Sequence, residues 1–224
     1  MTPIIRHDPA LRADFPTLVA AALVVEGADH LTSLALDPAR HLTVARARLA
    51  DTTEGALPEI RAWRAAFAAM GLKPTQYRCA SESLLRRLRT QGDMPALHPL
   101  IDFGNAVSAG FAIPLAIFDL DHIALPLTVT RATGDERYTT FAGEEEHPEP
   151  GEVIFRDVEG WAHSRRWTHR QSGRSAVRGF TRRALLVTEA LHDGAAVDVA
   201  RVVDTLTTAL RAAGATVEPV ATVG

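Results

Sequence analysis

Residues 99–121 read PLIDFGNAVSAGFAIPLAIFDLD, and the spacing of the apolar residues changes within this stretch. The first half predicts a helix that begins after Pro95 or Pro99, because proline is favoured in the first turn of a helix. The second half contains a short apolar run from Ile113 to Phe118, which is typical of a buried strand. The chain therefore passes from helices to strands at this point.

The region before this stretch is predicted to be mainly helical. An apolar run from Leu18 to Val25 indicates a buried strand. Helices are expected over Asp37–Asp51, from Pro58 to Gly71 and around Leu84 to Leu88, where apolar residues recur at helical spacing. On these faces we expect Trp63, Phe67 and Leu85 to lie in the core.

The region after this stretch is predicted to consist of strands, followed by one helix and a short final strand within residues 197–220. Helices and strands therefore come in blocks, which predicts an α+β fold rather than a doubly wound sheet. We expect one domain over residues 1–224. The expected strands are Leu125–Arg131, Tyr138–Phe141, Val153–Phe155, Trp161–Trp167, Ala184–Leu191 and Val217–Val220.

The composition is that of a globular protein and excludes several classes. Hydrophobic residues make up 46% and charged residues 23% of the 224 residues. Cys79 is the only cysteine, which excludes an internal disulfide and a cysteine-rich metal site. No stretch has the roughly 20 apolar residues of a membrane span, and no secretory signal is evident. We therefore expect a cytoplasmic protein that does not bind membranes.

Positive charge is concentrated in two segments, although the formal net charge is −3. Between Arg61 and Arg89 there are seven Lys or Arg residues and one acid, Glu82. Between Trp161 and Arg183 there are seven arginines and no acid. Two basic segments on an acidic body would attract a polyanion to one place and repel it elsewhere.

Motifs of the common nucleotide and hydrolase sites are missing from the sequence. There is no P-loop, no dinucleotide-binding glycine motif, no G-x-S-x-G elbow and no evident Ser-His or Cys-His pair. His163 and His169 lie six residues apart on a predicted strand, and two ligands alone are a weak metal signal. We interpret them as a solvent-facing pair and expect neither a metal nor a cofactor.

Three ordered groups of residues match a known pattern. They are Trp63–Arg64, Phe67, Gly71, Pro74, Tyr77–Arg78, Ser81–Glu82 and Leu84–Arg87; then Leu100–Asp102, Asn105, Ser108, Pro114 and Phe118–Asp121; then Pro150–Val153, Arg165–Trp167, Arg170, Ser172 and Ala184–Glu189. The chain thereby resembles the B3/B4 domain family over about residues 4–191. That domain is the editing module of the phenylalanyl-tRNA synthetase beta subunit and also occurs as small standalone proteins.

The resemblance implies a three-layer fold with a β-sandwich core and flanking helices. It also implies tRNA or aminoacyl-tRNA as the partner and hydrolysis of a wrongly attached amino acid as the activity. The sequence departs from the synthetase pattern at two positions. Ala116 stands where the synthetase has a histidine before its Phe-Asp pair, and Arg170 stands near the position of its glutamate. A tyrosine-specific reaction is therefore not expected.

Three polar groups are candidates for a cleft that binds the substrate or RNA. Tyr77, Arg78 and Glu82 belong to the first group, with a loop, a helix cap at Ser81 and an Arg78–Glu82 pair as the structural alternative. Asn105 and Ser108 lie on one helix, where internal hydrogen bonds are the alternative. The third group is Arg165, Arg166, Trp167 and Arg170.

The third group carries most of the predicted chemistry. On a strand, Arg165 and Trp167 would share one face, so that arginines could grip a phosphate or carboxylate while the indole stacks on a base. The alternative is an Arg–Trp stack on the surface. Arg170 is the candidate catalytic residue, either as a donor to a developing oxyanion or as a clamp for a carboxylate.

Asp119 and Asp121 follow the strand that ends the opening stretch. They could bind a cation or act as acid and base, but turn-forming hydrogen bonds to the local backbone are the favoured role.

Three functions remain open from the sequence. The first is a deacylase that acts in trans on mischarged aminoacyl-tRNA. The second is a non-catalytic module that binds RNA or nucleotides. The third is a binder or hydrolase of a small amino-acid-like molecule. A complete tRNA synthetase is excluded, because the chain lacks the length and the ATP-binding motifs that such an enzyme needs.

Overall fold

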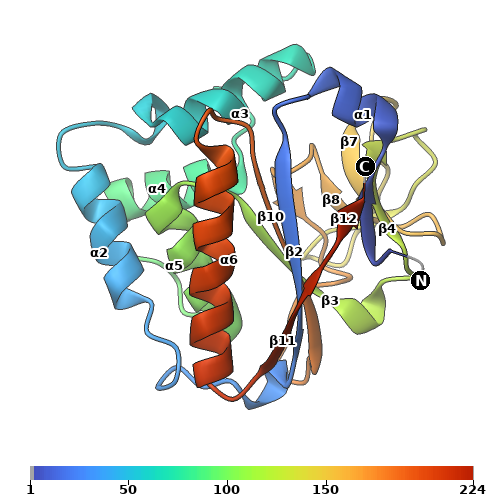
Figure 1. The fold of residues 1–224 in the computed structure, drawn as a ribbon. Helices are drawn as coiled ribbons and strands as arrows, with labels where there is room; N and C mark the ends of the chain where they lie inside the picture. The colour runs from blue at the N-terminus through green and yellow to red at the C-terminus, as the bar shows by residue number, and fades with distance from the viewer. Residues whose placement is uncertain (1–2, 224) are drawn as a thin grey trace.

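Strands β2 (Val19–Glu26), β10 (Arg183–Ala190) and β3 (Leu115–Asp119) lie at the centre of the computed structural model, which describes residues 3–223 (Figure 1). Together with β11 (Thr216–Val220) they form a four-stranded sheet in the order β11-β2-β10-β3, with every neighbouring pair antiparallel. Both faces of this sheet are buried. On β10, Ala184 and Leu186 face one core, and Leu185 and Val187 face the other.

Helices cover one face of this sheet. The helices α5 (Pro99–Phe111) and α6 (Ala195–Ala212) pack on it through Phe103, Val107, Val199 and Leu206. Further out lie α2 (Ala39–Arg48) and α4 (Ala80–Gln91), which contact α5. This packing explains the apolar spacing of the helical segments in the sequence.

A second sheet covers the other face. Its six strands are arranged in the order β12-β1-β4-β7-β8-β9. A core that contains Phe118, Leu185, Val129 and Phe155 fills the space between the two sheets, and α3 (Pro58–Ala69) packs against it. The strands are β1 (Ile5–His7), β4 (Leu127–Arg131), β7 (Val153–Arg156), β8 (Ala162–Arg165), β9 (Arg170–Gln171) and β12 (Thr222–Val223).

The predicted three-layer α+β arrangement, with a β-sandwich and flanking helices, is therefore confirmed (Figure 1). The smaller elements are α1 (Pro9–Asp14), a hairpin of β5 (Tyr138–Thr139) and β6 (Glu145–Glu146), and three short 3-10 helices at Ala28–His30, Glu54–Ala56 and Leu120–His122. No helix within residues 3–223 is both long enough and apolar enough to span a bilayer.

Two predicted boundaries are wrong in ways that affect the site. Helix α4 begins at Ala80, so Ser81 and Glu82 lie in its first turn rather than in a loop before it. The strand predicted over Trp161–Trp167 ends at Arg165. It ends there because Arg166 and Trp167 adopt positive φ angles of 47° and 59°, a left-handed turn that no strand can include.

Candidate functional site

A small cavity opens between the two sheets, where β3 and β10 approach the turn after β8. Its volume is about 60 Å³. Residues from the first turn of α4, from β3, from β10 and from residues 164–171 line it, and Gln171 ties the last of these to β3 by donating to the Ile117 carbonyl at 2.7 Å. The lining includes Ala116, Trp167, Thr168, His169, Arg170 and Glu189.

Trp167 forms one wall of this cavity but belongs to the core. Its side chain is completely buried, and its ring makes edge contacts with Phe15 and Trp63 at centroid distances of 5.0 Å. The indole N–H donates to Glu189 Oε2 at 3.0 Å. The prediction that Trp167 shares an exposed strand face with Arg165 is therefore wrong, and its ring is not accessible for stacking on a base.

Arg165 is held inside a network of carboxylates. Its guanidinium donates to both oxygens of Glu152 at 2.9 Å and to Glu146 at 2.7 Å. Burial alone would raise the pKa of Glu152, but the hydrogen bonds and positive charge of Arg165, together with the charge of Arg166, lower it. All three nitrogens of the Arg165 guanidinium donate to these two carboxylates. Arg165 therefore stabilises the fold rather than binding a ligand.

Arg166 and Arg170 lie closer to solvent beside the cavity. The guanidinium of Arg166 stacks over the Tyr77 ring, 4.6 Å from its centroid. Arg170 lines the cavity, remains 42% exposed and pairs with Glu146 at 3.3 Å. The structure thus brings Tyr77 of the first motif to the arginines of the third.

His169 joins these two motifs. Its Nδ1 lies 2.8 Å from the Arg78 carbonyl oxygen, and its ring meets Tyr77 edge-on at 5.4 Å. Burial lowers the pKa of His169, the charges of Arg166 and Arg170 act in the same direction, and the bond to the carbonyl opposes them. The ring is therefore neutral at pH 7. Nδ1 also lies 3.3 Å from the Arg78 amide nitrogen, and in the tautomer that donates the shorter bond to the Arg78 carbonyl, Nε2 is unprotonated and can accept a proton.

The remaining candidates of the first motif form an ion-pair cluster behind the cavity. Glu82 is buried and pairs with Arg64 at 2.5 Å and with Arg78 at 3.6 Å. Ser81 donates to the Ala112 carbonyl at 3.1 Å and does not cap α4. The predicted Arg78–Glu82 pair is present, whereas the predicted cap is not.

The candidates of the second motif do not reach the cavity. Ser108 is buried and donates to the Ile113 carbonyl at 2.7 Å, which secures the end of α5. Asn105 is half-buried on the same helix, and neither residue lines the cavity. Asp119 accepts from the Asp121 amide at 3.1 Å and from Thr181 at 2.7 Å, which is the turn-forming role that was favoured.

Sequence reasoning missed Glu189 at the base of the cavity. This carboxylate is 2% exposed and lies between two rings, with His7 Nε2 at 2.6 Å from Oε1 and the Trp167 indole on Oε2. Its strand matched the family pattern, but nothing in the local sequence indicates partners 182 and 22 residues away.

His163 was also misread as solvent-facing. It is completely buried and contacts Ser175 Oγ at 2.8 Å and Asp157 at 3.1 Å, an arrangement with the residue types of a serine-hydrolase triad. None of the three residues lines the cavity, and all three are buried. A nucleophile must be reached by its substrate, so we interpret this group as a structural hydrogen-bond network.

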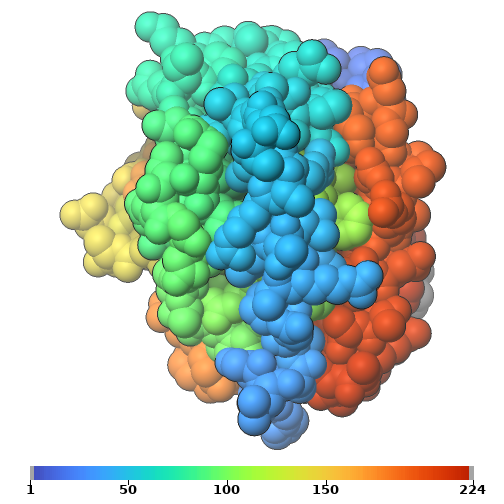
Figure 2. Space-filling model, turned by 90° about the vertical axis from the view of Figure 1, so that its left-hand side faces the viewer, coloured from blue at the N-terminus to red at the C-terminus, as the bar shows by residue number. Residues whose placement is uncertain are grey.

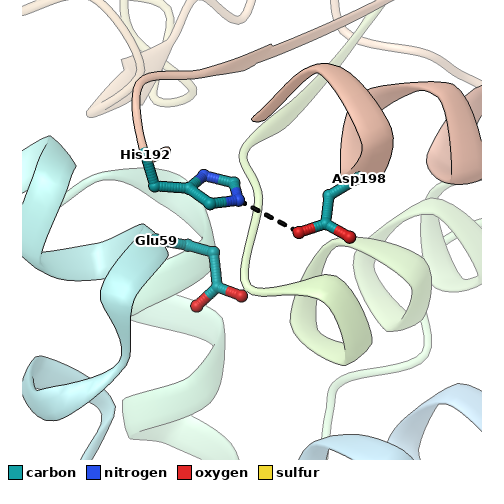
Figure 3. Close-up of side chains that lie close together, drawn as sticks. All are labelled: Glu59, His192 and Asp198. Carbon is teal, nitrogen blue, oxygen red and sulfur yellow. Dashed lines mark hydrogen bonds and ion pairs between the residues drawn. The ribbon is translucent and has the colours of Figure 1, made fainter. Parts of the chain in front are cut away.

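A second depression lies on the helical side, between α2 and α6, with α5 at its base (Figure 2). Its volume is about 990 Å³. Glu59, His192 and Asp198 come together from three segments at one end of this depression (Figure 3). One imidazole nitrogen and one oxygen from each carboxylate lie within 4.8 Å of one another. Arg48 pairs with Glu59 at 2.7 Å and Arg201 with Asp198 at 3.2 Å. These arginines offset both carboxylate charges, so we interpret the cluster as an ion-pair network that joins α3 to α6.

Comparisons with known proteins identify a family and a solved structure that are similar to this chain. The family model of the B3/4 domain matches residues 62–219. Among solved structures, an N-terminal fragment of the phenylalanyl-tRNA synthetase beta-subunit from Pyrococcus horikoshii superimposes with a TM-score of 0.52 at 14% sequence identity. The match covers 95% of this chain and 49% of that fragment, so the chain spans about half its length. No curated protein sequence matches this chain significantly.

Proposed function

Because the chain belongs to the B3/4 domain family, we propose that it acts in trans on aminoacylated tRNA and hydrolyses the ester bond of a wrongly attached amino acid. The family and the fold shared with the synthetase fragment support a role related to tRNA in general. The observation that supports the finer proposal is the cavity, which is lined by a neutral His169 and by Arg170. Such a role suits a cytoplasmic protein.

The proposed reaction uses water as the nucleophile. His169 Nε2 takes a proton from a water molecule whose oxygen attacks the ester carbonyl carbon. Arg170 donates to the oxygen that becomes negative in the tetrahedral intermediate. The carbon–oxygen bond to the ribose then breaks, and the proton on His169 passes to the leaving ribose oxygen. The products are a free amino acid and an uncharged tRNA.

The size of the cavity limits the amino acid that fits. A volume of about 60 Å³ exceeds the ~10–15 Å³ that one water needs but is far below the roughly 150 Å³ of a cavity that holds benzene. An aromatic side chain would therefore need the walls to move. The small volume supports a small amino acid, and Ala116 and Arg170 in place of the synthetase residues argue separately against tyrosine selectivity.

Single-turnover hydrolysis of a panel of aminoacyl-tRNAs tests the proposal. The panel should include alanyl-, seryl- and glycyl-tRNA, together with tyrosyl-tRNA that carries the phenylalanine anticodon. We expect release of a small amino acid, and His169→Gln should slow it about 100-fold or more. The control is His30→Gln, a change at a histidine whose side chain is 79% exposed.

Three outcomes would contradict this proposal. Robust release of tyrosine alone would contradict the size argument. tRNA binding without release from any pair would favour a non-catalytic RNA-binding module. Hydrolysis of free amino-acid esters without any tRNA binding would favour the small-molecule function.

A further inference from the structure

Glu189 is the only acid among the residues that line the small cavity within the described chain. The neighbouring lining residues supply no compensating charge at depth. His169 is neutral because burial lowers its pKa, and Arg170 lies at the mouth with Glu146 as its partner. Glu189 is therefore the one carboxyl group that lines the cavity, in mainly apolar surroundings.

Each oxygen of Glu189 has one partner in the protein and can accept a further hydrogen bond. An ionised carboxylate has about four lone-pair sites, and His7 and Trp167 occupy two of them. Because Glu189 lines the cavity, its remaining lone-pair sites can accept a donor that is supplied from outside. Thr168 Oγ1, which belongs to another lining residue, is also buried without a partner among the described residues.

His7 binds Glu189 but does not line the cavity. Its side chain is completely buried, and its Nδ1 has no hydrogen-bond partner among the described residues. A doubly protonated ring would bury an N–H group without an acceptor, which is costly. Only Nε2 of His7 contacts Glu189, so His7 occupies one lone-pair site of Oε1.

A primary ammonium group matches what the cavity lacks. It is cationic, it carries three donors and it is small enough for about 60 Å³. We propose that Glu189 binds the α-ammonium group of a small aminoacyl moiety, so that the site accepts amino acids with a free amine and a side chain of one or two heavy atoms. This inference deepens the proposed deacylase function and rests on it for the identity of the ester.

Small amides test the ammonium site without any RNA. Alaninamide carries the amine, and propionamide has the same carbon skeleton without it. Chemical shifts of the Trp167 indole N–H in labelled protein report on both, because this group donates to Glu189. We expect alaninamide to bind about ten- to a hundred-fold more tightly than propionamide, the range for a charge-assisted hydrogen bond.

Variants locate the effect. Glu189→Gln keeps the size of the side chain and removes its charge, so the preference for alaninamide should disappear. Glu218→Gln, at an exposed acid of β11, should keep it. Equal affinity for the two amides, or no binding of either to the wild-type protein, would overturn the proposal even if Glu189→Gln fails to fold.

The two proposals can fail separately. Alaninamide binding that depends on Glu189, without hydrolysis of any aminoacyl-tRNA, would leave the ammonium site standing and remove the deacylase function. Hydrolysis of N-acetylalanyl-tRNA as fast as alanyl-tRNA would do the reverse, since acetylation removes the positive charge but leaves the ester intact. We expect acetylation to slow hydrolysis at least about ten-fold.

Discussion

At the scale of single residues, the protonation of His169 decides whether the proposed hydrolysis can proceed. A general base works only when unprotonated, and burial holds the pKa of His169 below its ordinary value of 6.5. The single-turnover rate should therefore fall as the pH drops through that lowered pKa and stay level above it. A pH–rate profile with its midpoint at or above 6.5 would exclude His169 as the base.

Two phenylalanines provide a matched test of the core. Phe67 is 1% exposed on α3, and Phe141 is 71% exposed in the β5–β6 turn. Phe67→Ala should lower the free energy of unfolding by about 3–5 kcal/mol, and Phe141→Ala by less than about 0.5 kcal/mol. Urea denaturation of both variants measures the difference, and equal effects would contradict the assignment of Phe67 to the core.

The burial of individual residues could be predicted where they lie on a regular helix or strand, because one periodicity then fixes which face they occupy. It could not be predicted where a turn interrupts the regular spacing. Helical spacing correctly predicts that Trp63, Phe67 and Leu85 are core residues. Trp167 was misplaced because positive φ angles at Arg166 and Trp167 rotate the indole inward, and side-chain pattern does not reveal such a turn. Glu189 was missed because its partners come from β1 and from the turn after β8, which are distant in the sequence.

At the scale of elements, Arg165 joins β8 to the acids that precede β7 and form β6. Arg165→Ala would leave Glu152 buried without its charge partner, so we expect a loss of about 3–5 kcal/mol of stability. Arg170→Ala removes a partly exposed partner of Glu146 and should cost less than about 1 kcal/mol. Thermal or urea denaturation of the two variants distinguishes a buried ion pair from a surface one. Similar stabilities would mean that Arg165 is free to bind a ligand.

Most elements could be predicted because their apolar patterns are long. The strand over β10 and the passage from α5 to β3 follow from such runs. The strand β1 has only three residues, too few to show an alternation, and its neighbour α1 was also missed. In α1, Asp8 accepts from the Ala10 amide at 2.8 Å, and this Asp-Pro signal for a helix start was present in the sequence.

At the scale of the whole molecule, the basic segments are less available than the sequence suggests. Arg165, Arg182 and Arg183 pair with acids from other parts of the chain. If tRNA binds beside the cavity, Arg166 and Arg170 are the arginines of the second segment that lie nearest to the site and keep contact with solvent. The double variant Arg166→Ala with Arg170→Ala should weaken tRNA binding and reduce the log–log salt slope by up to about two units.

The control for this prediction is Arg6→Ala, at an exposed arginine of β1 outside both segments. Filter binding at several salt concentrations gives both slopes. If the double variant keeps the affinity and slope of the wild-type protein, the RNA contacts lie elsewhere, and the exposed Arg61, Lys73 and Arg87 become the next residues to test.

The layered architecture could be predicted from the block order of helices and strands together with the family resemblance. The spacing of apolar residues did not predict which strands pair within each of the two sheets. Strand order depends on contacts such as Ile5 with Thr222, which are far apart in the sequence. Local spacing carries no information about such pairs. The cavity between the sheets could not be predicted from the sequence, because it too depends on contacts between residues that are far apart in the chain.

The segment of residues 216–223 borders both sheets at once. Strand β11 pairs with β2 in one sheet, and β12 pairs with β1 in the other. Proteolytic removal of this segment would uncover two rows of backbone donors and acceptors, and uncovered strand edges promote aggregation between molecules. A chain that stops at Gly214 should therefore form oligomers that light scattering detects, even while its helices remain folded. In a cell, the quality-control machinery would therefore recognise a molecule without this segment as aggregation-prone.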